Sequence, residues 1–414
     1  MVGLAGMLGL AGLAGLPAKA SAAVLPARSS SAFADSVGVN VHMSYSDKAY
    51  RNAPRVLRSL RRLGIRHVRD GLVPGRPDQY AALRLLAGAG IRSTVIVGDP
   101  VGRFGTVNEL MPVIRGPLRG AVEALESVNE HDRSGRADWP GEVRAHQHRL
   151  AARAPRRLLV LGPTLSRNSS FVRLGRLPAR DVDRGNLHPY PDGDRPDRPG
   201  FVEEQLRLGA QISGGKAQWA TESGYHNGVG EQPGVSERAA AIYMPRLLLT
   251  NFVAGIRRTY MYELLDQAER SSDRSQDNRF GLLRSSFREK PAAGAVRRLL
   301  ALFGRSRGRC RGSVRVRITG LRFDLRTLAF RRCDGTSLMV LWRRAKVYDA
   351  TVGGDLPGRV RRITMRFNRP VVGARLHSPT GGARTPRLRA GRSFTIAVGP
   401  AVRVLVVPPA RRNR

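Results

Sequence analysis

Two glutamates follow directly after runs of residues that predict buried β-strands. Glu130 comes after the run 122–128, and Glu222 comes after the run 217–221. Cleavage of a glycosidic bond needs two carboxyl groups that face one cavity, because one protonates the leaving oxygen while the other attacks, or activates water, at the anomeric carbon. The pair therefore predicts an enzyme that hydrolyses O-glycosyl compounds, and we expect it to need neither a cofactor nor a metal ion.

Further polar and aromatic side chains stand at the ends of other predicted strands. The candidates to face the same cavity, and so to contact the substrate, are His42, Arg69, Asn129, His188, Tyr190 and Tyr262. Glu263 is the alternative to Tyr262 at the end of the eighth predicted strand. Successive side chains of a strand point to opposite faces, so only one of the two can face the cavity. We expect Tyr262 to be the one that does.

These residues can act together only if the ends of several strands meet at one place. Between residues 36 and 303, short strand-like runs alternate with longer amphipathic stretches, the pattern of repeated βα units around a parallel sheet. The predicted strands are 36–42, 65–70, 91–97, 122–128, 157–162, 185–188, 217–221 and 258–263. The predicted helices include 53–63, 77–89, 139–154, 201–210, 236–252 and 291–303.

Eight strands with intervening helices in about 265 residues fit a (β/α)8 barrel, an α/β fold also called a TIM barrel. We assign this barrel to residues 33–304, and a doubly wound open sheet is the alternative. In a barrel, reactive groups lie at the C-terminal ends of the strands, which is where Glu130 and Glu222 stand. The Arg-rich stretch 166–180 occupies the place of a regular fifth helix, so we expect the barrel to be irregular there.

After the Gly- and Arg-rich segment 304–312, the hydrophobic pattern changes to a period of two. Strand-like runs at 314–318, 327–333, 337–342, 363–367, 394–398 and 402–407 predict a small all-β sandwich domain over 312–414. Cys310 and Cys333, the two cysteines of the chain, fall in this part. They could form a disulfide or remain two separate buried thiols.

The strand-end residues resemble a known group of enzymes. Asn129-Glu130 after the fourth predicted strand and Thr221-Glu222 at the seventh are similar to the paired signature of glycoside hydrolase clan A. Arg69, His188, Tyr190 and Tyr262 stand where clan members hold conserved binding residues, and the resemblance covers residues 37–302. Many clan members place a tryptophan where this chain has Tyr262, a departure that bears on the substrate.

The resemblance implies a retaining double displacement on a β-linked sugar. Glu222 would be the nucleophile that forms a covalent glycosyl-enzyme, and Glu130 would first donate and then remove a proton. Asn129 would hydrogen-bond the sugar 2-hydroxyl, Tyr190 would orient one of the carboxyl groups, and Arg69 would keep Glu222 ionised. A retaining pair lies about 5–5.5 Å apart and an inverting pair about 6.5–9.5 Å, so the separation tests the mechanism.

The first residues of the chain predict export. Residues 1–20 contain an apolar run, too short to cross a bilayer comfortably, followed by a small-residue cleavage pattern, and they read as a signal peptide that lacks the usual positive start. We therefore expect a secreted or cell-wall-associated protein. No later segment is apolar enough for a membrane span.

The net charge of +39 would ordinarily point to a polyanion such as nucleic acid. The arginines are scattered rather than gathered into one stripe, so we expect no nucleic-acid partner. Association with an acidic cell-wall polymer stays open, as does the alternative of a non-catalytic wall-polysaccharide-binding protein on a barrel scaffold. Three aspartates at 192, 194 and 197 form an acidic loop that could bind calcium, but a solvated loop is favoured.

Overall fold

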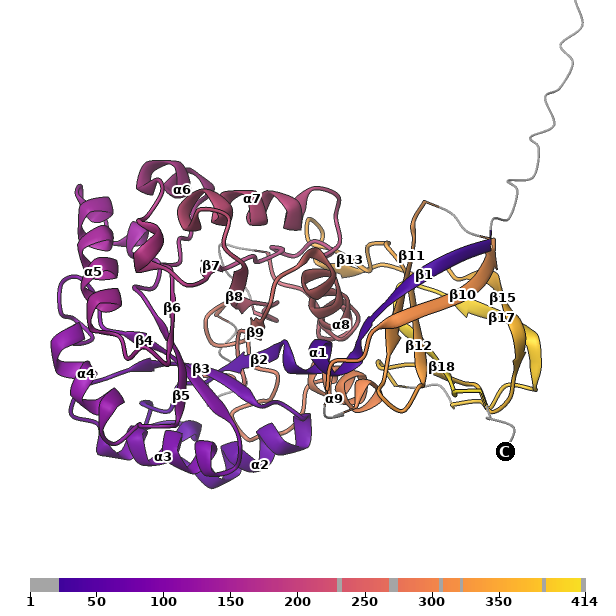
Figure 1. Ribbon diagram of the computed structural model, residues 1–414, viewed down its shortest axis with the longest axis horizontal. Helices are drawn as coiled ribbons and strands as arrows, with labels where there is room; N and C mark the ends of the chain where they lie inside the picture. The colour runs from indigo at the N-terminus through magenta and orange to yellow at the C-terminus, as the bar shows by residue number, and fades with distance from the viewer. Residues whose placement is uncertain are drawn as a thin grey trace, which may run out of the picture.

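The computed structural model describes residues 22–228, 233–267, 275–304, 308–320, 323–381 and 385–410. Two parts lie side by side, an α/β barrel and an all-β module (Figure 1). The predicted signal peptide, residues 1–20, lies outside the described residues. No helix within the described ranges has the length and apolar character to cross a membrane.

The barrel confirms the predicted (β/α)8 fold. Its parallel sheet contains β2 (Val37–Asn40), β3 (His67–Leu72), β4 (Arg92–Val97), β5 (Val122–Glu126), β6 (Leu159–Leu161), β7 (Gly185–Leu187), β8 (Gln218–Ser223) and β9 (Thr259–Met261). The neighbours run in the order β6-β5-β4-β3-β2-β9-β8-β7, and a parallel bridge between Leu161 and Arg184 joins β6 to the start of β7. The ring therefore closes, which excludes the doubly wound alternative.

Helices surround this ring, and their ends follow the local sequence. The set is α2 (Ala53–Leu63), α3 (Pro77–Gly88), α4 (Val107–Arg115), α5 (Trp139–Arg153), α6 (Asn168–Leu174), α7 (Phe201–Ser213), α8 (Glu237–Ala254) and α9 (Pro291–Phe303). In α2, the Asn52 side chain accepts a hydrogen bond from the Arg55 N–H, and Gly64 ends the helix in the left-handed conformation. The predicted irregularity after β6 is present, because α6 is short and a turn of 3₁₀ helix follows it.

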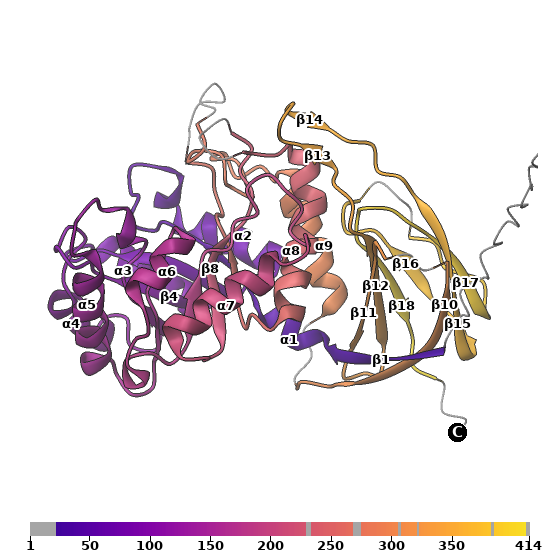
Figure 2. The same cartoon turned by 90° about the horizontal axis from the view of Figure 1, so that it is seen from above.

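The all-β module is one sheet of eight strands that curls on itself. It contains β10 (Gly312–Thr319), β11 (Leu325–Arg331), β12 (Ser337–Arg343), β15 (Arg361–Val371), β16 (Arg375–His377), β17 (Gly391–Val398) and β18 (Arg403–Val407). Its two halves face each other over a shared core, and β12 meets β17 across it (Figure 2). Cys310 and Cys333 form a disulfide, which settles the question that the sequence left open.

The eighth strand of the module comes from the other end of the chain. β1 (Ala22–Ser29) lies between β10 and β11, antiparallel to the first and parallel to the second. It runs from the module into α1 (Ser30–Asp35) and then into the barrel (Figure 1). The range 312–414 predicted for the module therefore omits one of its strands.

The barrel and the module share a continuous apolar interface. Leu338, Val340 and Trp342 on one face of β12 pack into the barrel-side core, while Met339 and Leu341 on the other face pack into the module core. The helices α8 and α9 lie against the module (Figure 2). Burial of both faces explains why β12 is apolar at nearly every position rather than alternating.

A buried polar cluster fastens this interface. Asp197 accepts hydrogen bonds from the Trp342 indole N–H at 2.6 Å and from the Arg246 guanidinium, whose side chain is fully buried. Arg246 also donates to the carbonyl oxygen of Ala345 at 2.9 Å. Asp197 thus stabilises the buried interface, whereas Asp194 forms longer surface ion pairs with Arg198 and Lys346.

We expect the substitution Asp197→Ala to lower the free energy of unfolding by about 3 kcal/mol, because it leaves the Arg246 charge buried without its carboxylate. The matched change Asp194→Ala removes a partly exposed carboxylate and should cost about 1 kcal/mol or less. Urea unfolding followed by tryptophan fluorescence measures both. Equal losses for the two variants would contradict the role assigned to Asp197.

Candidate active site

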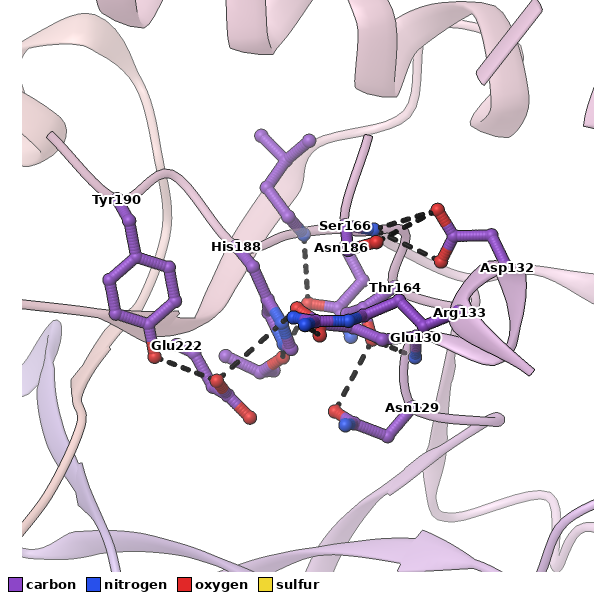
Figure 3. A network of polar contacts seen from close by, with 12 residues as sticks. Asn129, Glu130, Asp132, Arg133, Thr164, Ser166, Asn186, His188, Tyr190 and Glu222 are labelled. Atoms are coloured by element: carbon purple, nitrogen blue, oxygen red, sulfur yellow. Dashed lines mark hydrogen bonds and ion pairs between the residues drawn. The ribbon is translucent and has the colours of Figure 1, made fainter. Parts of the chain in front are cut away.

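The predicted site residues gather at the C-terminal end of the barrel strands. Glu130 follows β5, Glu222 lies near the end of β8, and His188 and Tyr190 follow β7. Figure 3 shows these side chains converging from their separate segments. All eight residues predicted for catalysis and substrate binding line one or both of the two cavities described below.

Arg69 on β3 is the centre of the hydrogen-bond network. Its guanidinium forms a forked pair with Glu126, with donor–acceptor distances of 2.9 and 2.6 Å, and it also donates to Glu222. Further donor bonds reach Asn129 at 2.7 Å and Asn40 at 3.0 Å. One buried cation therefore fixes two carboxylates and two amides.

The surroundings of Glu222 favour its ionised form. Burial alone would raise the pKa of this carboxyl group, but the charges of His188 and Arg69 and the hydrogen bond from the Tyr190 hydroxyl hold it below its usual range. The Tyr190 hydroxyl donates to Glu222 Oε2 at 2.7 Å. Burial raises the pKa of Tyr190 well above its ordinary value, so its proton remains available for this bond.

Glu130 has a different set of partners. Its Oε1 lies 2.7 Å from Nδ1 of His188, and the guanidinium of Arg133 lies 3.8 Å from its other oxygen. The backbone of Glu130 adopts a φ of 46°, unusual for a residue other than glycine, and its N–H donates to the Thr164 carbonyl oxygen at 3.2 Å. Such conformations persist where the surroundings impose them, and they cluster at active sites.

The orientation of His188 is set by Thr221. Nε2 of His188 lies 3.1 Å from the Thr221 hydroxyl, which also lies 2.9 Å from Asn186 Oδ1 and 3.1 Å from Glu126 Oε1. Because these two oxygens can only accept, the hydroxyl donates to one of them and accepts from Nε2–H of the imidazole. Nδ1 then faces Glu130 and can share a proton with it. The carboxylates of Glu222 and Glu130 raise the pKa of His188 against the opposing effect of burial.

One oxygen of Glu130, one oxygen of Glu222 and one nitrogen of His188 all lie within 4.8 Å of one another. The carboxyl groups of Glu130 and Glu222 therefore lie close together, as two carboxyl groups that act on one glycosidic bond must. A metal ion could be held by such a triplet in principle. The charge of Glu222 is already met by Arg69, which disfavours that use.

His42, Tyr262 and Glu263 form a second group beside the pair. Nε2 of His42 lies 2.9 Å from Glu263 Oε2, and the His42 ring lies 5.7 Å from the Tyr262 ring and is stacked 4.7 Å from the Tyr45 ring. Both residues follow the end of β9 at Met261, so strand alternation does not decide their directions, but Tyr262 lines both cavities described below and Glu263 lines neither. Glu263 is fully buried beneath the site.

The sequence analysis gave no role to several residues that hold the site together, namely Asn40, Glu126, Thr164, Asn186 and Thr221. Glu126 carried a detectable signal. It lies inside the predicted strand 122–128, where a fully buried carboxylate requires a cation, and Arg69 is the buried arginine on a neighbouring part of the ring. No sequence pattern identifies Thr164 as a site residue, because only the folded structure brings it into contact with Glu130.

Two cavities meet at the glutamates. The Phe171 cavity has a volume of about 900 Å³ and extends over α6, α7 and the segment after β7. The Phe104 cavity has a volume of about 870 Å³ and extends over the segments after β2, β3 and β4. Five residues line both of them: Asn129, Glu130, Arg133, Glu222 and Tyr262.

We expect Arg69→Met to lower the free energy of unfolding near neutral pH by about 3 kcal/mol, because Glu126 and Glu222 then remain buried without their cation. Loss of Arg69 raises the pKa of Glu222. As the pH is lowered, the variant should therefore lose its activity at a higher pH than the unsubstituted protein does. The stability loss should shrink as the pH falls and both carboxyl groups become protonated. The exposed variant Arg62→Met, which breaks a surface ion pair with Glu289, should cost about 1 kcal/mol or less. A loss for Arg69→Met that does not depend on pH would contradict this account.

The sequence matches no described protein family and no curated protein. Its fold is similar to that of solved structures at low identity. A family 39 glycoside hydrolase from Bacteroides cellulosilyticus WH2 has a TM-score of 0.66 at 16% identity, over 91% of this chain and 82% of that chain. For a monomeric beta-xylosidase from Caulobacter crescentus CB15 the TM-score is 0.60 at 14% identity, over 93% and 98% of the two chains. For the GH39 enzyme from Xanthomonas axonopodis pv. citri it is 0.59 at 15% identity, over 93% and 96%. The chain therefore has the barrel-plus-β-module fold of these glycoside hydrolases.

Proposed function

We propose that this protein is a retaining glycoside hydrolase that cleaves O-glycosidic bonds with Glu222 as nucleophile and Glu130 as general acid and base. The observation that carries the proposal is the approach of the two carboxylates to within 4.8 Å at the barrel mouth, together with their unequal surroundings. An approach this close supports a retaining pair, whose carboxyl groups lie about 5–5.5 Å apart. The names of the structural neighbours, glycoside hydrolases and a beta-xylosidase, support the same reaction class and a β-linked substrate.

In the first step, a carboxylate oxygen of Glu222 attacks the anomeric carbon while the bond from that carbon to the leaving oxygen breaks. Glu130 transfers its proton to the leaving oxygen, and a glycosyl ester remains on Glu222. The low pKa of Glu222 favours the ionised nucleophile, and the Arg69 and Tyr190 donors hold it in place. His188 fixes the Glu130 carboxyl group on the opposite side.

In the second step, Glu130 removes a proton from a water molecule, whose oxygen attacks the anomeric carbon and releases Glu222 as a carboxylate. Two inversions restore the original configuration. In this proposal, Asn129 hydrogen-bonds the sugar hydroxyl next to the anomeric carbon, and the hydrogen bond that it accepts from Arg69 supports this role by fixing its amide. Tyr262 and His42 provide aromatic and polar surface beside it.

The alternative, a binding protein that has lost catalysis, predicts a broken arrangement of the glutamates. The opposed pair within a cavity lined by His188, Tyr190 and Tyr262 favours the enzyme instead. We also propose that the protein is secreted or associated with the cell wall, where a disulfide such as Cys310–Cys333 is stable. The excess of arginine is compatible with adhesion to an acidic wall polymer.

The decisive experiment is mass spectrometry of the intact protein after incubation with a panel of 2-deoxy-2-fluoro aryl glycosides. These compounds form the glycosyl-enzyme of a retaining enzyme and release it slowly. We expect a mass increase by one fluorosugar, located on the peptide that contains Glu222. A folded protein that gives no adduct with any sugar, or an adduct at another residue, would overturn the assignment.

A further inference from the structure

The two cavities that meet at Glu130 and Glu222 extend the site over different segments of the barrel mouth. Each is within the range of about 300–1,000 Å³ that holds a drug-sized ligand, which is larger than one sugar ring. The sets of residues that line them overlap only around the glutamates. A chain of sugars bound across the site would thus have units on both sides of the bond to be cleaved.

The two cavities differ in charge. Apart from the shared residues, the Phe104 cavity is lined by four arginines and two aspartates, Arg69, Arg76, Arg103, Arg136, Asp70 and Asp99. The Phe171 cavity is lined instead by two arginines and three acidic residues, Arg167, Arg198, Asp192, Glu204 and Asp277. Of the four arginines in the Phe104 cavity, Arg69 is paired with Glu126 and Glu222, Arg76 with Asp78, and Arg136 with Glu142. Within the described residues, Arg103 is the one of these four that forms no ion pair.

The loop after β4 provides a cation and an exposed aromatic ring in that cavity. Asp99 accepts hydrogen bonds within the loop from the N–H groups of Val101 at 3.0 Å and Phe104 at 2.5 Å, and in the described part of the chain it forms no ion pair with Arg103. The guanidinium of Arg103 lies over the Phe104 ring, 5.1 Å from its centre. Phe104 is 54% exposed, so part of its ring is open to contact with a ligand.

The loop is also held in shape. Gly98 has a φ of 68°, and a Cβ atom there would lie 2.5 Å from the carbonyl oxygen of Gly105. The Asp99 N–H donates to the same carbonyl oxygen at 3.2 Å, which closes the loop. Phe104 and Arg103 are therefore presented to the cavity by a constrained backbone, which lowers the entropy lost on binding.

We propose that the substrate is an acidic polysaccharide that spans both cavities and places a sugar bearing a carboxylate or sulfate group against Arg103 and Phe104. Its sugar ring packs on the exposed aromatic face, and its anionic group pairs with the guanidinium. Cleavage then takes place within the chain rather than at its end. The proposal rests on the proposed glycosidase function and names the substrate class of the same site.

The test uses the full-length Glu222→Gln variant, which binds without turnover. Its dissociation constants are measured by calorimetry for oligosaccharides of hyaluronan, alginate, polygalacturonate and chondroitin sulfate, each beside a neutral counterpart with the acidic groups reduced or removed. We expect at least one acidic oligosaccharide to bind about tenfold more tightly than its neutral counterpart, with an affinity that falls as salt is added. Equal affinities in every pair would overturn the proposal.

Two further substitutions in the same variant locate the contact. Arg103→Gln should raise the dissociation constant of the acidic oligosaccharide about three- to tenfold. Arg315→Gln removes an equal charge from an exposed position on β10 of the module and should leave it unchanged. The same result for both variants would assign the preference to the overall charge of the protein and overturn the assigned subsite. Because binding here needs no reaction, failure of fluorosugar trapping at Glu222 would reject the glycosidase without altering this readout.

Discussion

Replacement of Glu222 by alanine should reduce kcat on an activated aryl glycoside by about 10⁴-fold or more, because the covalent route then has no nucleophile. The fold should be retained, since alanine leaves no buried charge and Arg69 keeps its forked pair with Glu126. The measurement is the steady-state rate together with the unfolding midpoint. The variant Glu203→Ala, which removes an exposed carboxylate of α7, should keep the full rate.

Added azide gives this prediction a stereochemical readout. The space left by the Glu222 side chain can admit the small anion, which then attacks the anomeric carbon directly. We expect a glycosyl azide of inverted configuration, identified by nuclear magnetic resonance. An azide product of retained configuration from Glu222→Ala would mean that another residue is the nucleophile.

Replacement of Glu130 by alanine should have an effect that depends on the leaving group. For substrates with poor leaving groups, which need protonation, kcat/KM should fall by about 10²–10⁴-fold. A dinitrophenyl glycoside leaves without a proton, so formation of the glycosyl-enzyme should be slowed far less. The comparison of the two substrates on one variant is an internal control for damage to the fold.

With added azide, the Glu130→Ala variant should give a product of the opposite configuration to that expected from Glu222→Ala. Azide can replace water in the second step, where no base is needed to deprotonate it, and it attacks the sugar on Glu222. The product should be a glycosyl azide of retained configuration, formed with an increased rate. An equal loss for good and poor leaving groups, without azide rescue, would contradict the acid/base role of Glu130.

The barrel was predictable because its strands and most of its helices carry strong local patterns. The predicted helices 53–63 and 291–303 agree with α2 and α9 to the residue. The helix α4 was missed because Pro112 lies within it, although Thr106 and Glu109 form a capping box at its start. The position of β1 in the sheet of the module could not be predicted, because it depends on pairing with β10 and β11, which lie far away in the sequence.

The candidate site was predictable as far as strand ends determine it. Glu130 follows β5 and Glu222 lies near the end of β8, and a barrel brings such strand ends to one mouth, whereas Arg69 lies within β3 and reaches them with its long side chain. The contact of Thr221 with His188 depends on side-chain directions at two strands far apart in the sequence, and no single-sequence pattern reports it. Tyr262 lines both cavities and Glu263 neither, although β9 ends at Met261 and the alternation rule of a strand does not reach these two residues.

The position of β1 links the order of synthesis to the order of folding. This strand leaves the ribosome before the barrel, but its partners β10 and β11 follow the barrel in the chain. Until they emerge, the backbone N–H and C=O groups of β1 lack their sheet partners and remain open to other strands. When β10 and β11 have been synthesised and pair with β1, the segments before and after the barrel become joined in one sheet, late in synthesis. A fragment that stops after α9 would keep an unpaired β1 and should aggregate more readily than the full chain.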